Sequence, residues 1–215
     1  DYAFCKRRGY LTACPTNLGT GIRVSAMLHL PGLVLSEQIN QIIQAVNKLG
    51  LAVRGLHGEG TEALGNVFQV SNQMTLGETE SDIVERLNKV LLQIIDHEEN
   101  ARAKLLENKA KMVYNHIGRA YGILANSHSI SSKETMNLLS LFRLGIDLSL
   151  FPGSKPALTE ELFIITQPAH LQKTRAGKLS AEKRDILRAN LLRDRLRKVD
   201  RPDTPDAGKT EENGE

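Results

Sequence analysis

The chain of 215 residues has very little cysteine: Cys5 and Cys14 are its two thiols. Two thiols exclude the disulfide framework of a small secreted protein and fit a reducing cytosol, so we expect a cytoplasmic location. The six histidines show no HxxxH spacing and the cysteines show no CxxC spacing, so we expect no metal site of the zinc type. No apolar run approaches the roughly 18 residues that are needed to cross a bilayer.

The chain also lacks a strong excess of either charge. Its formal net charge is +3, and basic and acidic residues are mixed along most of its length. This balance does not suggest a nucleic acid as a direct partner. The sequence starts at Asp1 without a methionine, a basic region or an apolar region, so no secretory signal is visible and we expect further sequence upstream.

The first third of the chain predicts a mixture of strands and helices. Runs of apolar and β-branched residues predict three strands, at 22–30, 51–56 and 66–72. Pro31-Gly32 is expected to end the first strand. An apolar stripe at helical spacing then predicts a helix that runs from an N-cap at Ser36 to Leu49, with Gly50 at the C′ position. The glycines of 55–65 predict a mobile loop.

After Gly77 the pattern is helical almost throughout. Apolar residues at helical spacing predict four helices, at about 78–117, 132–148, 159–171 and 180–198. The polar tail is not expected to fold. We therefore predict an α+β fold class, with part of an α+β domain at 1–102, a helical domain at 103–201 and a disordered tail at 202–215.

The stretch 14–23, Cys-Pro-Thr-Asn-Leu-Gly-Thr-Gly-Ile-Arg, contains the first candidate chemistry. Cys14 stands beside Pro, Thr and Asn and before two glycines, a good position for a thiolate of low pKa that pairs with a guanidinium. Without a motif, a buried structural cysteine is the simpler interpretation.

Arg23 and Arg54 are candidates for a phosphate clamp. Arg23 falls in the first predicted strand and Arg54 near the end of the second, just before the glycine-rich loop. Guanidinium groups that project from adjacent strands can bind phosphate oxygens, as phosphoryl transfer requires. Two surface arginines in unrelated ion pairs would show the same pattern.

A second arginine pair lies in the segment Arg-Asp-Ile-Leu-Arg-Ala at 184–189. Arg184 and Arg188 are four residues apart and share one face of the predicted helix. The two arginines suit a phosphate, and Asp185 suits a guanidinium. Spacing alone equally supports a charged, solvated helix.

Together these segments resemble the ATP:guanido phosphotransferases, the family of the creatine and arginine kinases. The resemblance rests on 14–23, 28–31, Arg54-Gly55 with its glycine loop, and 65–77. The long helical extension and the Arg184–Ala189 motif resemble the bacterial protein-arginine kinase branch. The implied fold is the C-terminal part of a phosphagen-kinase catalytic lobe, an antiparallel sheet with helices, followed by an all-helical domain.

The resemblance also implies roles for individual residues. The nucleotide site would comprise Arg23, Val24, Ser25, Ala26, Met27, Arg54, Gly55, Leu56, His57, Gly58 and Glu59. Arg23 and Arg54 would hold the phosphates of ATP, whose charge Mg²⁺ would neutralise. Cys14 would be the reactive cysteine near the guanidinium, and Glu59 would orient that group. A further nucleotide segment and a catalytic carboxylate would lie upstream of Asp1.

The implied activity is the transfer of the ATP γ-phosphoryl group to arginine side chains of proteins. Such kinases mark proteins for a Clp-type protease, act on a heat-shock repressor in the stress response and form homodimers. Arg184, Asp185, Arg188 and Ala189 would form an allosteric pocket for phosphoarginine. Two alternatives stay open: a phosphagen kinase that acts on a free guanidino compound, and a phosphoarginine-binding and dimerisation module without catalysis. The second is the behaviour that we expect of this chain alone.

Overall fold

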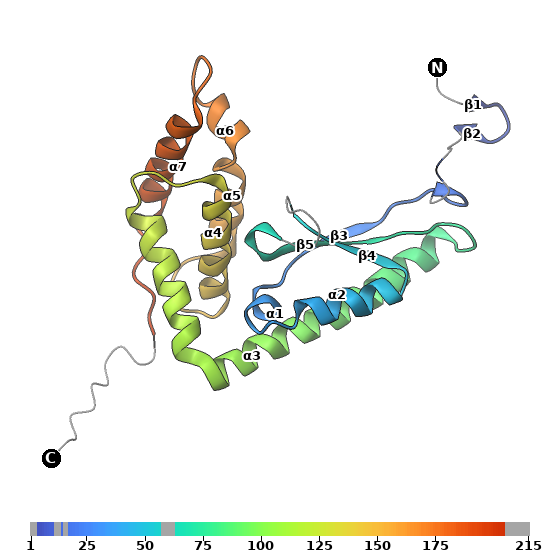
Figure 1. Cartoon of the computed structure of the whole chain (residues 1–215), viewed down its shortest axis with the longest axis horizontal. Coiled ribbons are helices and arrows are strands. Elements are labelled where there is room, and N and C mark those ends of the chain that lie inside the picture. The colour runs from blue at the N-terminus through green and yellow to red at the C-terminus, as the bar shows by residue number, and fades with distance from the viewer. Residues whose placement is uncertain (1–3, 11–13, 15–16, 57–62, 205–215) are drawn as a thin grey trace. The chain divides into compact units, whose positions relative to one another are not determined.

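The chain forms two compact units, Asp1–Ala103 and Lys104–Glu215. The computed structural model describes residues 4–10, 14, 17–56 and 63–204 (Figure 1). Strands occur in the first unit and helices make up the second, so the predicted α+β class is confirmed. In the described part of the chain, no helix is both long and apolar enough to cross a membrane.

A three-stranded antiparallel sheet organises the first unit. Its strands are β3 (Ser25–His29), β4 (Leu51–Gly55) and β5 (Val67–Asn72), in the order β3-β5-β4. Each strand lies within a predicted range, so the three strand predictions are confirmed. A shorter pair, β1 (Phe4–Cys5) with β2 (Gly9–Tyr10), was not predicted, because strands of two residues have too few positions to show alternation.

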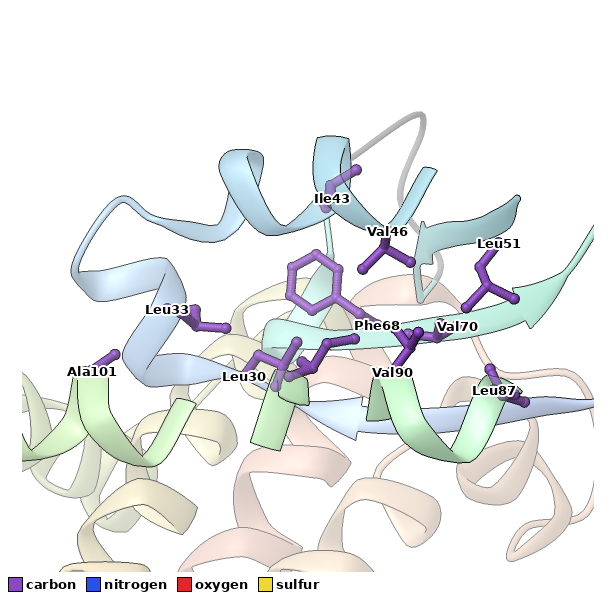
Figure 2. Packing of buried hydrophobic residues seen from close by; sticks show 11 residues of the cluster. Leu30, Leu33, Ile43, Val46, Leu51, Phe68, Val70, Leu87, Val90 and Ala101 are labelled. Carbon is purple, nitrogen blue, oxygen red and sulfur yellow. The ribbon is translucent and has the colours of Figure 1, made fainter. Parts of the chain in front are cut away.

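One face of the sheet forms the core of the first unit. Phe68 and Val70 of β5 are two residues apart and both buried, as expected for side chains on one face of a strand. They pack with Ile43 and Val46 of α2 (Ile39–Lys48) and with Val90 of α3 (Glu80–Asn126). Figure 2 shows these side chains converging, and Figure 1 shows α2 and the first part of α3 along the same side of the sheet.

The segment after β3 forms a helix that was not predicted. The strand stops ahead of Pro31, as predicted, and Pro31 then begins a short helix, α1 (Pro31–Leu35), where its fixed φ suits the first helical turn. The α1 N-terminus is capped from far along the chain, because the carboxylate of Glu98 accepts hydrogen bonds from the backbone N–H groups of Gly32 and Leu33.

The start of α2 was mispredicted. Ser36 is the C-cap residue of α1, and its hydroxyl donates to the carbonyl of Leu33, so α2 begins at Ile39 and its N-cap is Gln38, two residues after the predicted N-cap. The end of α2 is confirmed: Gly50 has φ of 73° and its N–H donates to the carbonyl of Asn47.

The helix α3 (Glu80–Asn126) extends beyond the predicted end at 117. It begins with a capping box, in which the Thr79 hydroxyl accepts from the N–H of Asp82 and the Asp82 carboxylate accepts from Thr79. The hydrogen bonds from the hydroxyl and then the N–H of Thr79 hold the pKa of Asp82 below its usual value. The backbone leaves helical geometry at Lys109.

Four shorter helices follow in the second unit. They are α4 (Ser132–Asp147), α5 (Pro156–Ile165), α6 (Pro168–Lys173) and α7 (Ala181–Leu196). The predictions of α4 and α7 are confirmed. The single helix predicted at 159–171 is wrong, because Gln167 precedes a proline and adopts an extended conformation that divides α5 from α6.

An aromatic cluster lies in the core of the second unit. The rings of Phe142 and Phe151 meet edge to face at 4.7 Å between centroids, and Tyr121 stands 5.4 Å from Phe151. Gly145 of α4 lets the Phe151 ring approach closely, since an added Cβ would come within 2.5 Å of it. The Tyr121 hydroxyl donates to the carbonyl of Val199 and so ties the residues after α7 to this core.

Candidate functional site

The second face of the three-stranded sheet is polar. The register places Ser25 opposite Ser71, and both Met27 and Arg54 opposite Gln69. Because paired residues point to the same side and residues 69 and 71 share a side, these five side chains lie on the face opposite to Phe68 and Val70. We call Ser25, Met27, Arg54, Gln69 and Ser71 the polar face.

Both candidate phosphate-binding arginines reach the polar face. Arg54 lies in β4 and is exposed. Arg23 is also exposed, and its Nη2 donates to the Ser71 hydroxyl at 3.2 Å. Two details of the prediction were wrong: Arg23 stands two residues before β3, and β5 separates β3 from β4. The two guanidinium groups therefore approach one face from the two sides of β5.

The segment that carries Arg23 is held by a buried amide. The Asn72 side-chain oxygen accepts from the N–H of Val24 at 2.8 Å, and its Nδ2 donates to the carbonyls of Ile22 at 2.9 Å and Met74 at 3.3 Å. Only 3% of Asn72 is exposed. The backbone N–H of Asn72 also donates to the carbonyl of Val24 at 3.3 Å, so the backbone and the side chain of Asn72 together fix the chain on both sides of Arg23.

The glycine turn that follows Cys14 is held against the end of β5. The Thr75 hydroxyl donates to the carbonyl of Leu18 at 2.5 Å, and the N–H of Thr20 donates to the carbonyl of Thr75 at 3.3 Å. Gly19 has φ of +89°, and a Cβ there would lie 2.2 Å from the Thr75 oxygen. The turn therefore requires glycine. Cys14 itself is exposed rather than buried, and its carbonyl accepts from Asn17.

The second predicted nucleotide-binding segment is only partly described. The N–H of Leu56 donates to the carbonyl of Val67, and the carbonyl of Leu56 accepts from the N–H of Leu64, which joins the two ends of the glycine-rich loop. Gly55 is opposite Phe68 in the register. Of the remaining candidates in this segment, His57, Gly58 and Glu59 lie outside the described residues, so the role given to Glu59 stays a prediction.

The first predicted nucleotide-binding segment places side chains on both faces of the sheet at β3. Ser25 and Met27 lie on the polar face and are exposed, Met27 by 49%. Val24 and Ala26 are half-buried, with Val24 packed against the apolar core. Within β3, the exposed candidates for ligand contact are therefore Ser25 and Met27.

The motif at 184–189 lies on α7 and is largely turned inward. Arg188 is 1% exposed and Ala189 is completely buried. Arg184 is half-buried and its Nη1 donates to the carbonyl of Leu179 at 2.7 Å. The carboxylate of Asp185 accepts from Nη1 of Arg188 at 2.5 Å. Arg184 and Arg188 thus have different surroundings, although helical spacing places them on one side of α7.

The residues that orient Arg23 were not predicted to have a role. Ser71 and Asn72 were part of the family resemblance, and their polar side chains at the end of an apolar strand are the signal that marks them. The polar face carries hydroxyl, amide and guanidinium donors, which suit an anionic ligand. Where the chain is described, no group of three His, Cys, Asp or Glu side chains is placed to hold a metal ion.

Two family models match the chain. Residues 1–101 match the C-terminal catalytic domain of the ATP:guanido phosphotransferases, and residues 110–207 match the C-terminal domain of the protein-arginine kinase McsB. Residues 1–101 therefore form a domain of the ATP:guanido phosphotransferase family. The second match agrees with the predicted resemblance to the protein-arginine kinase branch of that family.

Named relatives agree with this assignment. The chain is 54% identical to a protein-arginine kinase of Bacillus licheniformis, over 92% of this chain and 54% of that protein. It is 53% identical to the protein-arginine kinase of Bacillus subtilis, over 91% of this chain and 54% of that protein. The chain thus spans about half the length of these relatives. Among solved structures, a lombricine kinase matches 48% of this chain and 28% of its own at 36% identity and a TM-score of 0.39.

Proposed function

We propose that this chain supplies part of the active site of a protein-arginine kinase, which transfers the γ-phosphoryl group of ATP to arginine side chains of proteins. The observation that carries the proposal is the approach of Arg23 and Arg54 to one polar face of the sheet. The match of both halves of the chain to this branch of the family supports it.

The arginines act by position and charge. A phosphoryl group in transfer carries negative charge on its equatorial oxygens, and guanidinium groups that are already oriented stabilise this charge without reorganisation. Ser71 holds the guanidinium of Arg23, and Asn72 holds the backbone on either side of it. Arg54 stands at the base of the glycine-rich loop. When bound, ATP supplies the phosphoryl group, and Mg²⁺ neutralises part of its charge.

Two further residues belong to the proposal. Cys14, exposed ahead of the glycine turn, would lie near the substrate guanidinium, where a thiolate and the cation stabilise each other. Glu59 would orient the same guanidinium from the glycine-rich loop. Both assignments rest on the family resemblance.

The second unit is proposed to regulate the kinase. The domain at 103–201 would bind phosphoarginine through the motif Arg184, Asp185, Arg188 and Ala189 and would join two copies into a homodimer. The match of residues 110–207 supports this assignment. By resemblance, the phosphorylated proteins would pass to a Clp-type protease, a heat-shock repressor would be one substrate, and the kinase would act in the cytoplasm during stress.

A chimera tests the catalytic proposal. In it, this chain replaces the matching half of the Bacillus subtilis relative. The chimera is incubated with Mg·ATP and either an unfolded protein or free arginine, and acid-labile phosphate is measured. We expect labelling of the protein and not of free arginine. Arg54→Ala is expected to lower the rate by about 10²-fold or more, the size found when one transition-state donor is removed.

The control variant is Lys89→Ala, which removes an exposed positive charge from α3. It is expected to keep the rate of the unmodified chimera. Labelling of free arginine would instead identify a phosphagen kinase. A folded chimera that labels neither substrate but binds phosphoarginine would leave the non-catalytic binding module. Equal rates for Arg54→Ala and Lys89→Ala would refute the role of the polar face.

A further inference from the structure

Thr75, just beyond the end of β5, binds the glycine turn with both its side chain and its backbone. Its hydroxyl donates to the carbonyl of Leu18 at 2.5 Å, and its own carbonyl accepts from the N–H of Thr20 at 3.3 Å. These two hydrogen bonds fall on either side of Gly19, where an added Cβ would lie 2.2 Å from the Thr75 oxygen. Thr75 is 4% exposed. A buried residue thus holds both flanks of the turn.

The turn connects Thr75 to Cys14. The N–H of Asn17 donates to the carbonyl of Cys14 at 3.0 Å, and Asn17 directly precedes Leu18. Two hydrogen bonds and one peptide unit therefore join the backbone of Cys14 to the hydroxyl of Thr75. The side chain of Cys14 is exposed, so packing around the thiol contributes little to its position.

The stretch from Cys14 to Arg23 is held at its other end by different residues. Ser71 accepts from the guanidinium of Arg23, and Asn72 bonds the backbone on both sides of it. The hydroxyl of Thr75 makes its printed hydrogen bond at the Leu18 end, five residues before Arg23. Loss of that hydroxyl therefore frees the end near Cys14 and leaves the hydrogen bonds around Arg23 in place.

We infer that Thr75 is a positioning residue for Cys14. Its hydroxyl fixes the glycine turn, and the turn fixes the backbone that carries the thiol. Position matters in this role, because a displacement of about 1 Å can lower a catalysed rate by roughly 10²-fold. The catalytic half of the inference rests on the proposed function of Cys14, whereas the anchoring of the turn does not.

Kinetics of the chimera test the catalytic half. Thr75→Val removes the hydroxyl and keeps the shape of the side chain, Thr75→Ser keeps the hydroxyl, and exposed Gln73→Ala is the control. We expect Thr75→Val to lower kcat with a protein substrate about tenfold or more and to leave the KM for ATP within about twofold. Thr75→Ser and Gln73→Ala should keep kcat. An unchanged kcat in Thr75→Val, or a raised KM for ATP alone, would overturn the inference.

A double-mutant cycle shows whether Thr75 acts through Cys14. Cys14→Ser should lower kcat by itself, and Thr75→Val should then have little further effect, because the two substitutions remove one shared contribution. The same fold-loss from Thr75→Val in both backgrounds would mean that Thr75 acts elsewhere, and would refute the inference. If Cys14→Ser keeps full activity, the proposed role of Cys14 fails, and the catalytic half of the inference fails with it.

Hydrogen exchange tests the anchoring without any activity. Exchange of the amides in 17–22 is followed by mass spectrometry on the chain itself and on the three variants, after thermal unfolding has shown that each is folded. Thr75→Val should speed exchange of the Thr20 amide at least about tenfold, while Thr75→Ser and Gln73→Ala keep its protection. Equal protection in all four proteins would refute the anchoring. If the chimera labels no substrate, the proposed function fails, and this measurement alone decides the anchoring.

Discussion

Replacement of Asn72 by alanine is expected to remove the hydrogen bonds that hold the segment with Arg23 against β5. The amide of Asn72 makes three hydrogen bonds, to the N–H of Val24 and to the carbonyls of Ile22 and Met74. Alanine can replace none of them, so three backbone groups lose their partner at a position that is 3% exposed. The substitution therefore lowers the stability of the sheet, and it also displaces Arg23 in the candidate site.

The size of the effect follows from those three bonds. An unsatisfied buried group costs about 1–3 kcal/mol, and the lower figure applies here because Ile22 and Val24 are only half-buried and water can reach part of their backbone. The free energy of unfolding should therefore fall by about 3 kcal/mol. For a urea dependence of about 2 kcal/mol per molar, the transition midpoint moves down by about 1.5 M.

The measurement is urea unfolding of the chain, followed by circular dichroism, with Gln73→Ala as the matched control. Gln73 is the next residue and is exposed, so its replacement is expected to stay within about 0.5 kcal/mol of the unmodified chain. In the chimera, Asn72→Ala should also raise the KM for ATP, because Arg23 loses its position. Equal stability of the two variants would refute the account of how Arg23 is held.

Three further predictions concern the framework. Glu98→Gln should cost about 2–3 kcal/mol in urea unfolding, because an amide cannot accept all the bonds that Glu98 accepts, while exposed Glu99→Gln should have little effect. Gly145→Ala should cost about 1–3 kcal/mol in thermal unfolding, since its Cβ would press on Phe151; an unchanged midpoint would contradict this packing. Burial raises the pKa of Tyr121 above its ordinary 10.0, so its stabilising contribution is present below pH 10.0 and is lost as the pH rises through the raised value. Absorbance at 295 nm should show a late tyrosine step that is missing in Tyr121→Phe.

Local chemistry in the sequence was enough to predict most elements of the fold. The three strands of the sheet follow from alternation and β-branched residues, and α4 and α7 follow from helical spacing, with Ser131 and Ser180 accepting capping hydrogen bonds. The candidate site residues Arg23 and Arg54 were selected through a family resemblance, and the comparisons confirm that resemblance. These features could be predicted because each depends on residues that lie within a few positions of one another in the sequence.

The remaining features depend on contacts between distant residues. The N-terminus of α1 is capped by Glu98, 66 positions from Gly32, and no local pattern shows that acceptor. Arg23 and Arg54 approach one face because β5 lies between β4, which carries Arg54, and β3, which follows Arg23, a strand order that alternation does not reveal. The spacing of Arg184 and Arg188 predicts a common side of one helix. Only the packing of α5 and the α3–α4 connection against α7 buries Arg188, because burial depends on which segments fold over a residue.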